Sequence, residues 1–199
     1  MRIAKALALS GLALAVGLGI VGAQDKGKGG KGGGKGGGIP APLNLTVTGY
    51  ADGAAIPSKF GCSGGQNPNV SPAISWTGAP QGTMAFAIIF HDTDVALPNG
   101  DDVLHWAIFD IPGTATGLPE NVAKTATLPD GSVQMNNIAG MPGYFNPCPP
   151  PPTVHHYIFE VYALDQKLGL PASTSRADLL KAMQGHIRAK GTYVGTYHQ

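Results

Sequence analysis

The folded part of this chain lacks the excess of cations that a nucleic-acid surface requires. Of the 199 residues, those from 39 to 199 include seven Lys and Arg against eleven Asp and Glu, a formal charge of −4. The chain also lacks an internal repeat with a period of roughly 20 to 50 residues. These absences argue against a nucleic-acid partner and against a solenoid or propeller.

The motifs of common hydrolases are missing as well. There is no His-Glu-x-x-His zinc motif, no histidine pair at helical spacing and no Gly-x-Ser-x-Gly nucleophile elbow. A metal-dependent hydrolase stays open as the less favoured alternative, with ligands or an acid–base pair drawn from His91, Asp92, Asp94, His105, His155 and His156. The sequence favours a protein that is not an enzyme, with no metal and no cofactor.

Residues 1–23 have the three-part layout of a secretory signal peptide. Arg2 and Lys5 precede an apolar run that ends in the small residues Gly22 and Ala23. Cleavage after Ala23 would yield a periplasmic or secreted protein. Because the run approaches the length of a membrane span, an uncleaved anchor is the alternative. The glycines within the run and the small residues at its end favour cleavage.

Residues 24–38 consist almost entirely of glycine and lysine. Such a segment cannot bury enough apolar surface to fold, so we predict a flexible tether. Its four lysines and one aspartate give it a formal charge of +3, which would allow weak adhesion to an anionic surface. A solubilising spacer is the simpler interpretation.

Residues 39–199 are numerous enough for one domain with its own hydrophobic core. This segment contains the only two cysteines of the chain, Cys62 and Cys148. Exported proteins meet an oxidising environment, and we therefore expect these two residues to form a disulfide. Two buried free thiols are the alternative, because a sequence does not give their separation.

Short alternating or apolar runs, separated by Pro, Gly, Asn and Asp, dominate this domain and predict β-strands. The runs cover residues 43–48, 73–76, 84–90, 103–111, 155–164 and 191–197. With long loops between them, they predict a mainly β protein, an antiparallel β-sandwich-like fold with a C-terminal helix and few other short helices.

The predicted helix begins at a capping box at Ser175 and ends before Gly191. Between these residues, apolar side chains recur at helical spacing, at Leu179, Leu180, Met183 and Ile187. His186 falls on the face of Leu179 and Met183 and is therefore expected to be packed.

Polar residues continue the apolar face of the strand predicted at residues 84–90. Residues two apart share one face of a strand, so Asp92 and Asp94 follow the face of Phe86 and Phe90. His91 ends the opposite face and is expected at the rim or the surface. The two carboxylates therefore extend the more apolar side of the strand.

Two further strands carry polar residues near their starts. By the same alternation, His105 lies on one face of its strand, with Leu104 and Trp106 on the other. His155 and Tyr157 lead into an apolar face. If the three strand ends are neighbours, they form a small pocket of the kind that binds small molecules. Taken singly, each residue is better explained as a satisfied buried group or a solvated strand end. Their joint occurrence beside a proline-rich turn is what favours the pocket.

The turn of residues 143–152 is rich in proline and leads directly toward His155. Prolines fix φ and stiffen a loop, so we interpret the turn as a rigid pocket wall held by Cys148. A polyproline ligand for another protein is the competing interpretation.

Six short motifs follow one another between residues 43 and 197. They are Ser71-Pro72-Ala73-Ile74-Ser75-Trp76, Gly78-Ala79-Pro80, Asp92-Thr93-Asp94, His105-Trp106, Asn146-Pro147-Cys148-Pro149-Pro150 and His155-His156-Tyr157. In order and rough spacing the set resembles the phosphatidylethanolamine-binding family, in its bacterial Raf kinase inhibitor-like branch.

The resemblance implies a β-fold with a pocket for a phosphate-like anion or a phospholipid head group. Carried over by position, its ligand-binding residues are Asp92, Asp94, His105, Pro147, His155 and Tyr157. We expect His105 and His155 to donate to anionic oxygens. We expect Asp92 to orient a histidine and to favour its protonated form.

The chain departs from the family pattern at two positions. Thr93 stands where the family has a proline, which removes a residue that would stiffen the site loop. Asn146 stands where the family has a glycine, and it suits a left-handed backbone better than most residues.

Together these features favour an exported, non-catalytic binding protein for a small anionic ligand. The alternative is an interaction module, such as an inhibitor of a secreted protease or a partner of an envelope protein. That alternative rests on the family resemblance alone.

Overall fold

The computed structural model describes residues 41–62 and 68–199. The predicted signal peptide and tether lie outside the described residues. Within these two ranges, no helix is both long enough and apolar enough to cross a membrane.

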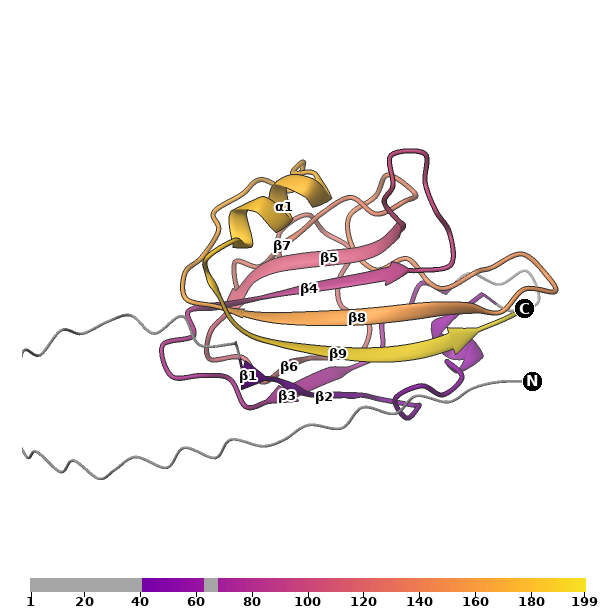
Figure 1. Cartoon of the computed structure of the whole chain (residues 1–199), viewed down its shortest axis with the longest axis horizontal. Helices are drawn as coiled ribbons and strands as arrows, with labels where there is room; N and C mark the ends of the chain where they lie inside the picture. Colours follow the sequence, from indigo (N-terminus) through magenta and orange to yellow (C-terminus); the bar gives the residue numbers. More distant parts are fainter. Residues whose placement is uncertain (1–40, 63–67) are drawn as a thin grey trace, which may run out of the picture. The chain divides into compact units, whose positions relative to one another are not determined.

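Two β-sheets pack face to face (Figure 1). The larger sheet has the strand order β1-β9-β8-β4-β5-β7, and the smaller has the order β2-β3-β6. The strands are β1 Ala41–Pro42, β2 Asn44–Val47, β3 Ile74–Thr77, β4 Ala85–Asp92, β5 Val103–Pro112, β6 Gly117–Leu118, β7 Val133–Gln134, β8 His155–Leu164 and β9 Ile187–Tyr197. All paired strands are antiparallel except β1 and β9. The predicted mainly antiparallel β-sandwich is confirmed.

The central strand β4 is buried along its whole length. On one face, Phe86 and Phe90 lie in the core between the two sheets, where Trp76 packs on Phe86 with ring centroids 4.9 Å apart. On the other face, Ala87 and Ile89 lie in a second core beneath the helix α1, Arg176–Met183. Figure 1 shows α1 and the smaller sheet on opposite sides of the larger sheet.

The strand pattern was most informative where strands are long. β8 coincides with its predicted run, and β4 and β5 differ from theirs by two residues or fewer. The two-residue strands β1, β6 and β7 and the 3-10 helix η1, Ser58–Phe60, were not predicted. Elements this short contain too few residues to show a period.

The helix α1 begins where the capping box predicted. The Ser175 hydroxyl accepts a hydrogen bond from the Asp178 backbone N–H at 3.1 Å. The helix ends at Met183 rather than continuing through Ile187, which is the first residue of β9. Gly185 adopts a φ of 80°, a conformation in which the helix cannot continue.

Because the helix ends at Met183 and β9 begins at Ile187, two further predictions were wrong. His186 lies between α1 and β9 rather than on the helix, with its Nδ1 2.9 Å from Asp165 Oδ1 and its side chain 37% exposed. Gly191 lies within β9 and does not stop a helix. A Cβ at this glycine would lie 2.5 Å from the Leu43 carbonyl oxygen, so close packing of the two segments requires glycine here.

The predicted disulfide between Cys62 and Cys148 is present, with the Cα atoms 5.2 Å apart. Cys62 follows η1, and Cys148 belongs to the proline-rich turn. The Cys62 backbone N–H also donates to the Pro147 carbonyl oxygen at 2.9 Å. The turn is therefore held to the η1 segment by one covalent bond and one hydrogen bond.

We predict that replacing both cysteines by alanine destabilises the protein. The bond closes a loop of 86 residues, and its loss returns about 4 to 5 kcal/mol of chain entropy to the unfolded state. Urea unfolding of the two proteins measures the difference. A reducing agent should lower the stability of the wild type and leave that of the double variant unchanged. Equal stabilities would show that the bond contributes nothing.

Candidate functional site

A bulge in β5 positions the first histidine of the site. In the pairing of β4 with β5, Phe90 lies opposite Trp106 and His91 lies opposite Leu104, so His105 has no partner in β4. An extra residue in one strand breaks the alternation of its side chains. His105 consequently lies on the same side of the sheet as Trp106.

The faces predicted for this part of β5 were wrong because of the bulge. Alternation assigned His105 and Trp106 to opposite faces and Leu104 and Trp106 to the same face. Leu104 instead packs on the core beneath α1. The ring of His105 lies 5.8 Å from that of Phe90 and 5.2 Å from that of Tyr157. The bulge thus brings His105 to the ends of β4 and β8.

Asp92, at the end of β4, and His155, at the start of β8, form a buried pair. His155 Nδ1 lies 2.7 Å from Asp92 Oδ2. Asp92 Oδ1 accepts a hydrogen bond from the Asp94 backbone N–H at 3.0 Å. A carboxylate only accepts, so Nδ1 of His155 carries the proton in this bond. The Nε2 atom is the ring nitrogen that is left for a ligand.

His105 is locked to Phe145 by two hydrogen bonds. Its Nδ1 donates to the Phe145 carbonyl oxygen at 3.0 Å, and the Phe145 backbone N–H donates to the His105 carbonyl oxygen at 2.9 Å. Nε2 is again the free ring nitrogen. Burial lowers the pKa of His105 below its ordinary value, so this imidazole is neutral at pH 7 in the unliganded protein.

These side chains line a cavity of about 180 Å³, which we call the histidine cavity. Its polar residues are Asp92, His105, His155 and Tyr157, and the rest of its lining is Val95, Val103, Ile138, Phe145, Cys148, Pro149 and Pro150. Burial raises the pKa of Tyr157 well above its ordinary value, and the nearby Asp92 carboxylate adds to the rise. The Tyr157 hydroxyl therefore stays protonated.

The other two predicted site residues, Asp94 and Pro147, are not among the residues that line this cavity. Asp94 Oδ2 lies 3.0 Å from His156 Nδ1, and the backbone N–H of His156 lowers the pKa of Asp94. Pro147 is buried, and its carbonyl oxygen accepts the hydrogen bond from Cys62. Both residues hold neighbouring loops in position.

The proline-rich turn of residues 143–152 does line the cavity, through Phe145, Cys148, Pro149 and Pro150. Phe145 was part of this predicted wall but was not named as a site residue. Sequence reasoning missed Ile138, which lies in the segment between β7 and β8, where no strand or helix period marks the residues that point inward.

One of the two departures from the family pattern, Thr93, has a local explanation. The Thr93 backbone N–H donates to the His156 carbonyl oxygen at 3.1 Å, a bond that a proline could not make. Asn146 is fully buried and does not have a positive φ, so the left-handed backbone considered for it is not adopted. Its backbone N–H donates to Asn69 Oδ1 at 3.0 Å.

His91 is only 6% exposed, and the prediction of a rim or surface position was wrong. It lies on the opposite face of β4 from Asp92, with its Nδ1 2.6 Å from Asp102 Oδ2. Asp102 also forms an ion pair with Arg176 of α1. The helix covers this face of the sheet, and the strand pattern alone contained no sign of that cover.

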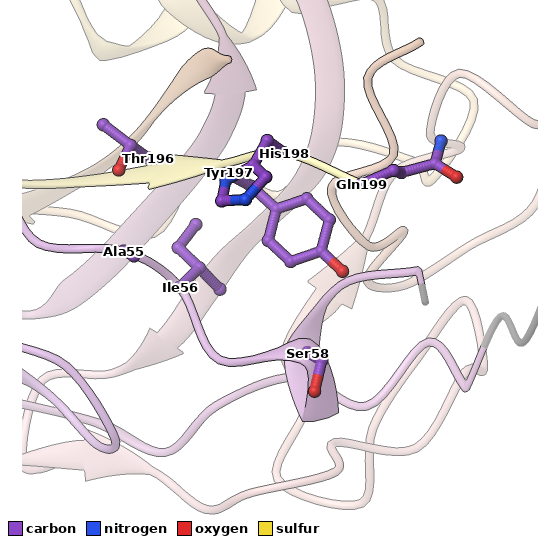
Figure 2. Close-up of a pocket in the computed structure, with 7 residues that line it drawn as sticks. All are labelled: Ala55, Ile56, Ser58, Thr196, Tyr197, His198 and Gln199. Carbon is purple, nitrogen blue, oxygen red and sulfur yellow. The ribbon is translucent and has the colours of Figure 1, made fainter. Parts of the chain in front are cut away.

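A larger cavity, of about 260 Å³, lies near the C-terminus (Figure 2). It is lined by Ala55, Ile56, Ser58, Thr196, Tyr197, His198 and Gln199. His198 is the one imidazole in this lining, and the Tyr197 hydroxyl is already bonded to the Cys62 carbonyl oxygen. The histidine cavity, with two imidazoles and an oriented carboxylate, is therefore the better candidate site.

The histidine cavity can offer two imidazole Nε2 atoms and one phenol hydroxyl to a small polar molecule. Over residues 41–62 and 68–199, no group of three or more His, Cys, Asp or Glu side chains is arranged to hold a metal ion.

The fold and the cavity place this chain among β-sandwich proteins with a small, partly polar cavity at the ends of the central strands. The model of the family described as "Phosphatidylethanolamine-binding protein" matches residues 46–198. The chain belongs to this family, and within it to the bacterial branch.

Three comparisons illustrate the relationship. A UPF0098 protein of Methanothermobacter thermautotrophicus is 41% identical over 157 residues, covering 79% of this chain and 99% of that protein. "Putative lipoprotein LppC" of Mycobacterium tuberculosis is 32% identical over 210 residues, covering 95% of this chain and 96% of that protein. The crystal structure of Escherichia coli YbcL, described as a new member of the mammalian PEBP family, has a TM-score of 0.70 at 31% identity and covers 80% of this chain and 99% of that chain.

We predict that the unliganded protein loses stability as the pH falls below about 6.5. Burial lowers the pKa of folded His105, so below about pH 6.5 the unfolded state binds a proton that the folded state does not. The contribution of His105 should lower the free energy of unfolding by up to about 1.4 kcal/mol for each unit by which the pH falls.

Urea unfolding between about pH 7.5 and pH 5.5 measures this slope. The His105→Gln variant should show a flatter slope, whereas the same change at the exposed His198 should leave the slope as in the wild type. An identical slope in the His105→Gln variant would assign the effect to other groups.

Proposed function

We propose that this chain is an exported, non-catalytic protein that binds a small anion, a phosphate-like group or a phospholipid head group, in the histidine cavity. The observation that carries the proposal is the way the two histidines are held. Each commits Nδ1 to a fixed acceptor, His105 to the Phe145 carbonyl and His155 to Asp92. Each therefore has Nε2 free for the same ligand.

The charge of the cavity makes anion binding depend on protons. With both imidazoles neutral, Asp92 gives the cavity a formal charge of −1, which repels an anion. Protonation of His105 and His155 would change the charge to +1 and turn both Nε2 atoms into donors. The bound anion should therefore raise the proton affinity of the histidines, and the affinity for the anion should increase as the pH falls.

Asp92 fits an orienting role better than a catalytic one. Both of its oxygens already accept hydrogen bonds, from His155 and from the Asp94 backbone. A carboxylate in this position fixes the direction of the imidazole ring and its tautomer. A binding function uses this arrangement without any further group.

The proposed export rests on residues 1–23 and on one relative. The Mycobacterium tuberculosis protein that aligns with 95% of this chain is named as a lipoprotein, which supports an envelope location. Both cysteines of the present chain are bridged, so neither offers a thiol for lipid attachment. A periplasmic or secreted protein accounts for both observations.

We predict that phosphate, phosphoethanolamine or acetate raises the melting temperature at pH 6 and does so less at pH 8. At a ligand concentration of about 100 Kd, the stabilisation is about 2.7 kcal/mol, or roughly 5 °C or more for a protein of this size. Differential scanning fluorimetry measures the shift. The His105→Ala variant should lose it.

The matched control is His198→Ala, which removes the imidazole of the cavity in Figure 2. This variant should keep the shift. Loss of the shift in His198→Ala but not in His105→Ala would show that the anion binds in the cavity of Figure 2 instead. No shift with any of the three anions would overturn the proposal.

A further inference from the structure

Another cavity, smaller than the histidine cavity and distinct from that in Figure 2, shares a lining residue with the histidine cavity. Its volume is about 150 Å³, and its lining is mainly apolar, with side chains of Met141, Pro142, Tyr144 and Phe145. We call it the apolar cavity. Phe145 lines both cavities, and the chain neighbours Asn137 and Ile138 line one each. Phe145 is therefore a wall residue of both cavities.

The shared wall is held at a fixed position relative to the site. Two hydrogen bonds join the backbone of Phe145 to His105, and the two rings lie 5.7 Å apart. An anion bound at Nε2 of His105 would therefore always have the Phe145 side chain beside it. A substituent on that anion can extend along the ring of Phe145 into the apolar cavity.

The polar residues that line the apolar cavity are Asn69, Lys124 and Asn137, and Asn69 Oδ1 already accepts a hydrogen bond from the Asn146 backbone N–H at 3.0 Å. Asn137 is satisfied internally, since its Nδ2 donates to the Gly143 carbonyl at 2.9 Å and its Oδ1 accepts from the Ala139 N–H at 2.9 Å. Lys124 is exposed and adds positive charge beside the cavity, which favours an anionic ligand.

Large apolar side chains are exposed at both cavities. Ile138, which lines the histidine cavity, is 51% exposed, and Met141, which lines the apolar cavity, is 55% exposed. Water contact with side chains of this size is unfavourable, so a ligand that covers them gains affinity. Both side chains lie in the segment between β7 and β8, so the apolar surface that a ligand would cover lies on one side of the site.

The volume limits the size of the occupant. A cavity of about 150 Å³ with an apolar lining accommodates one benzene ring. We propose that the ligand of this protein is an anion that carries one ring-sized apolar group, with the anionic end at His105 and His155 and the ring against Phe145 in the apolar cavity. This inference rests on the anion site proposed above.

Isothermal titration of the full chain at pH 6 with methyl phosphate and benzyl phosphate tests the inference. Both esters carry the same anionic group, so their affinity ratio isolates the ring. Burial of a ring-sized apolar surface should make benzyl phosphate bind at least about tenfold more tightly. The Met141→Glu variant should reduce this ratio to about threefold or less, because it brings a hydrated, negative group to the apolar cavity.

The matched control is Met84→Glu, at a methionine that is 58% exposed and lies before the opposite end of β4. It should keep the wild-type ratio. A wild-type ratio near one, with methyl phosphate bound, would overturn the ring-binding inference and leave the anion site intact. No binding of either ester would overturn the anion site itself. An unchanged ratio in Met141→Glu would place the ring elsewhere and also overturn the inference.

Discussion

The central strand β4 is buried on both faces, and this burial governs how the other elements pack around it. Every residue from Ala85 to Asp92 is buried, so the strand has no solvent-facing side to which a shifted register could turn. Apolar residues fill one face against the smaller sheet and the other against α1. The polar residues His91 and Asp92 then fall at the same end of the strand, on opposite faces, and each must find partners inside the protein.

Those partners tie together parts of the chain that are distant in sequence. On the helix side, Asp102 binds both His91 and Arg176, and so connects β4, the segment before β5 and α1. On the other side, Asp92 pairs with His155, which connects β4 with β8. Loss of one member of a buried pair leaves a charge without compensation, so these contacts specify the arrangement of the strand ends.

The histidine cavity is built from exceptions to regular structure. His105 reaches it only because β5 has one residue more than β4 at this point. Its backbone is then held by Phe145, from a segment that the disulfide at Cys148 ties to η1. Bulges commonly occur where a strand must redirect one side chain toward a site. The same restraint that orients His105 also fixes the aromatic wall between the two cavities.

The long strands and the N-cap at Ser175 follow from the amino-acid sequence alone, because strand period and capping chemistry are local properties. The presence of two cysteines in an exported chain favoured the disulfide, and the structure shows the bond. The sequence also identified Asp92, His155 and Tyr157 as polar continuations of apolar faces. The face of His105 could not be predicted from the sequence, because a bulge depends on how two strands pair. The burial of His91 and the end of α1 depend likewise on what packs against them, and an individual segment does not encode its neighbours.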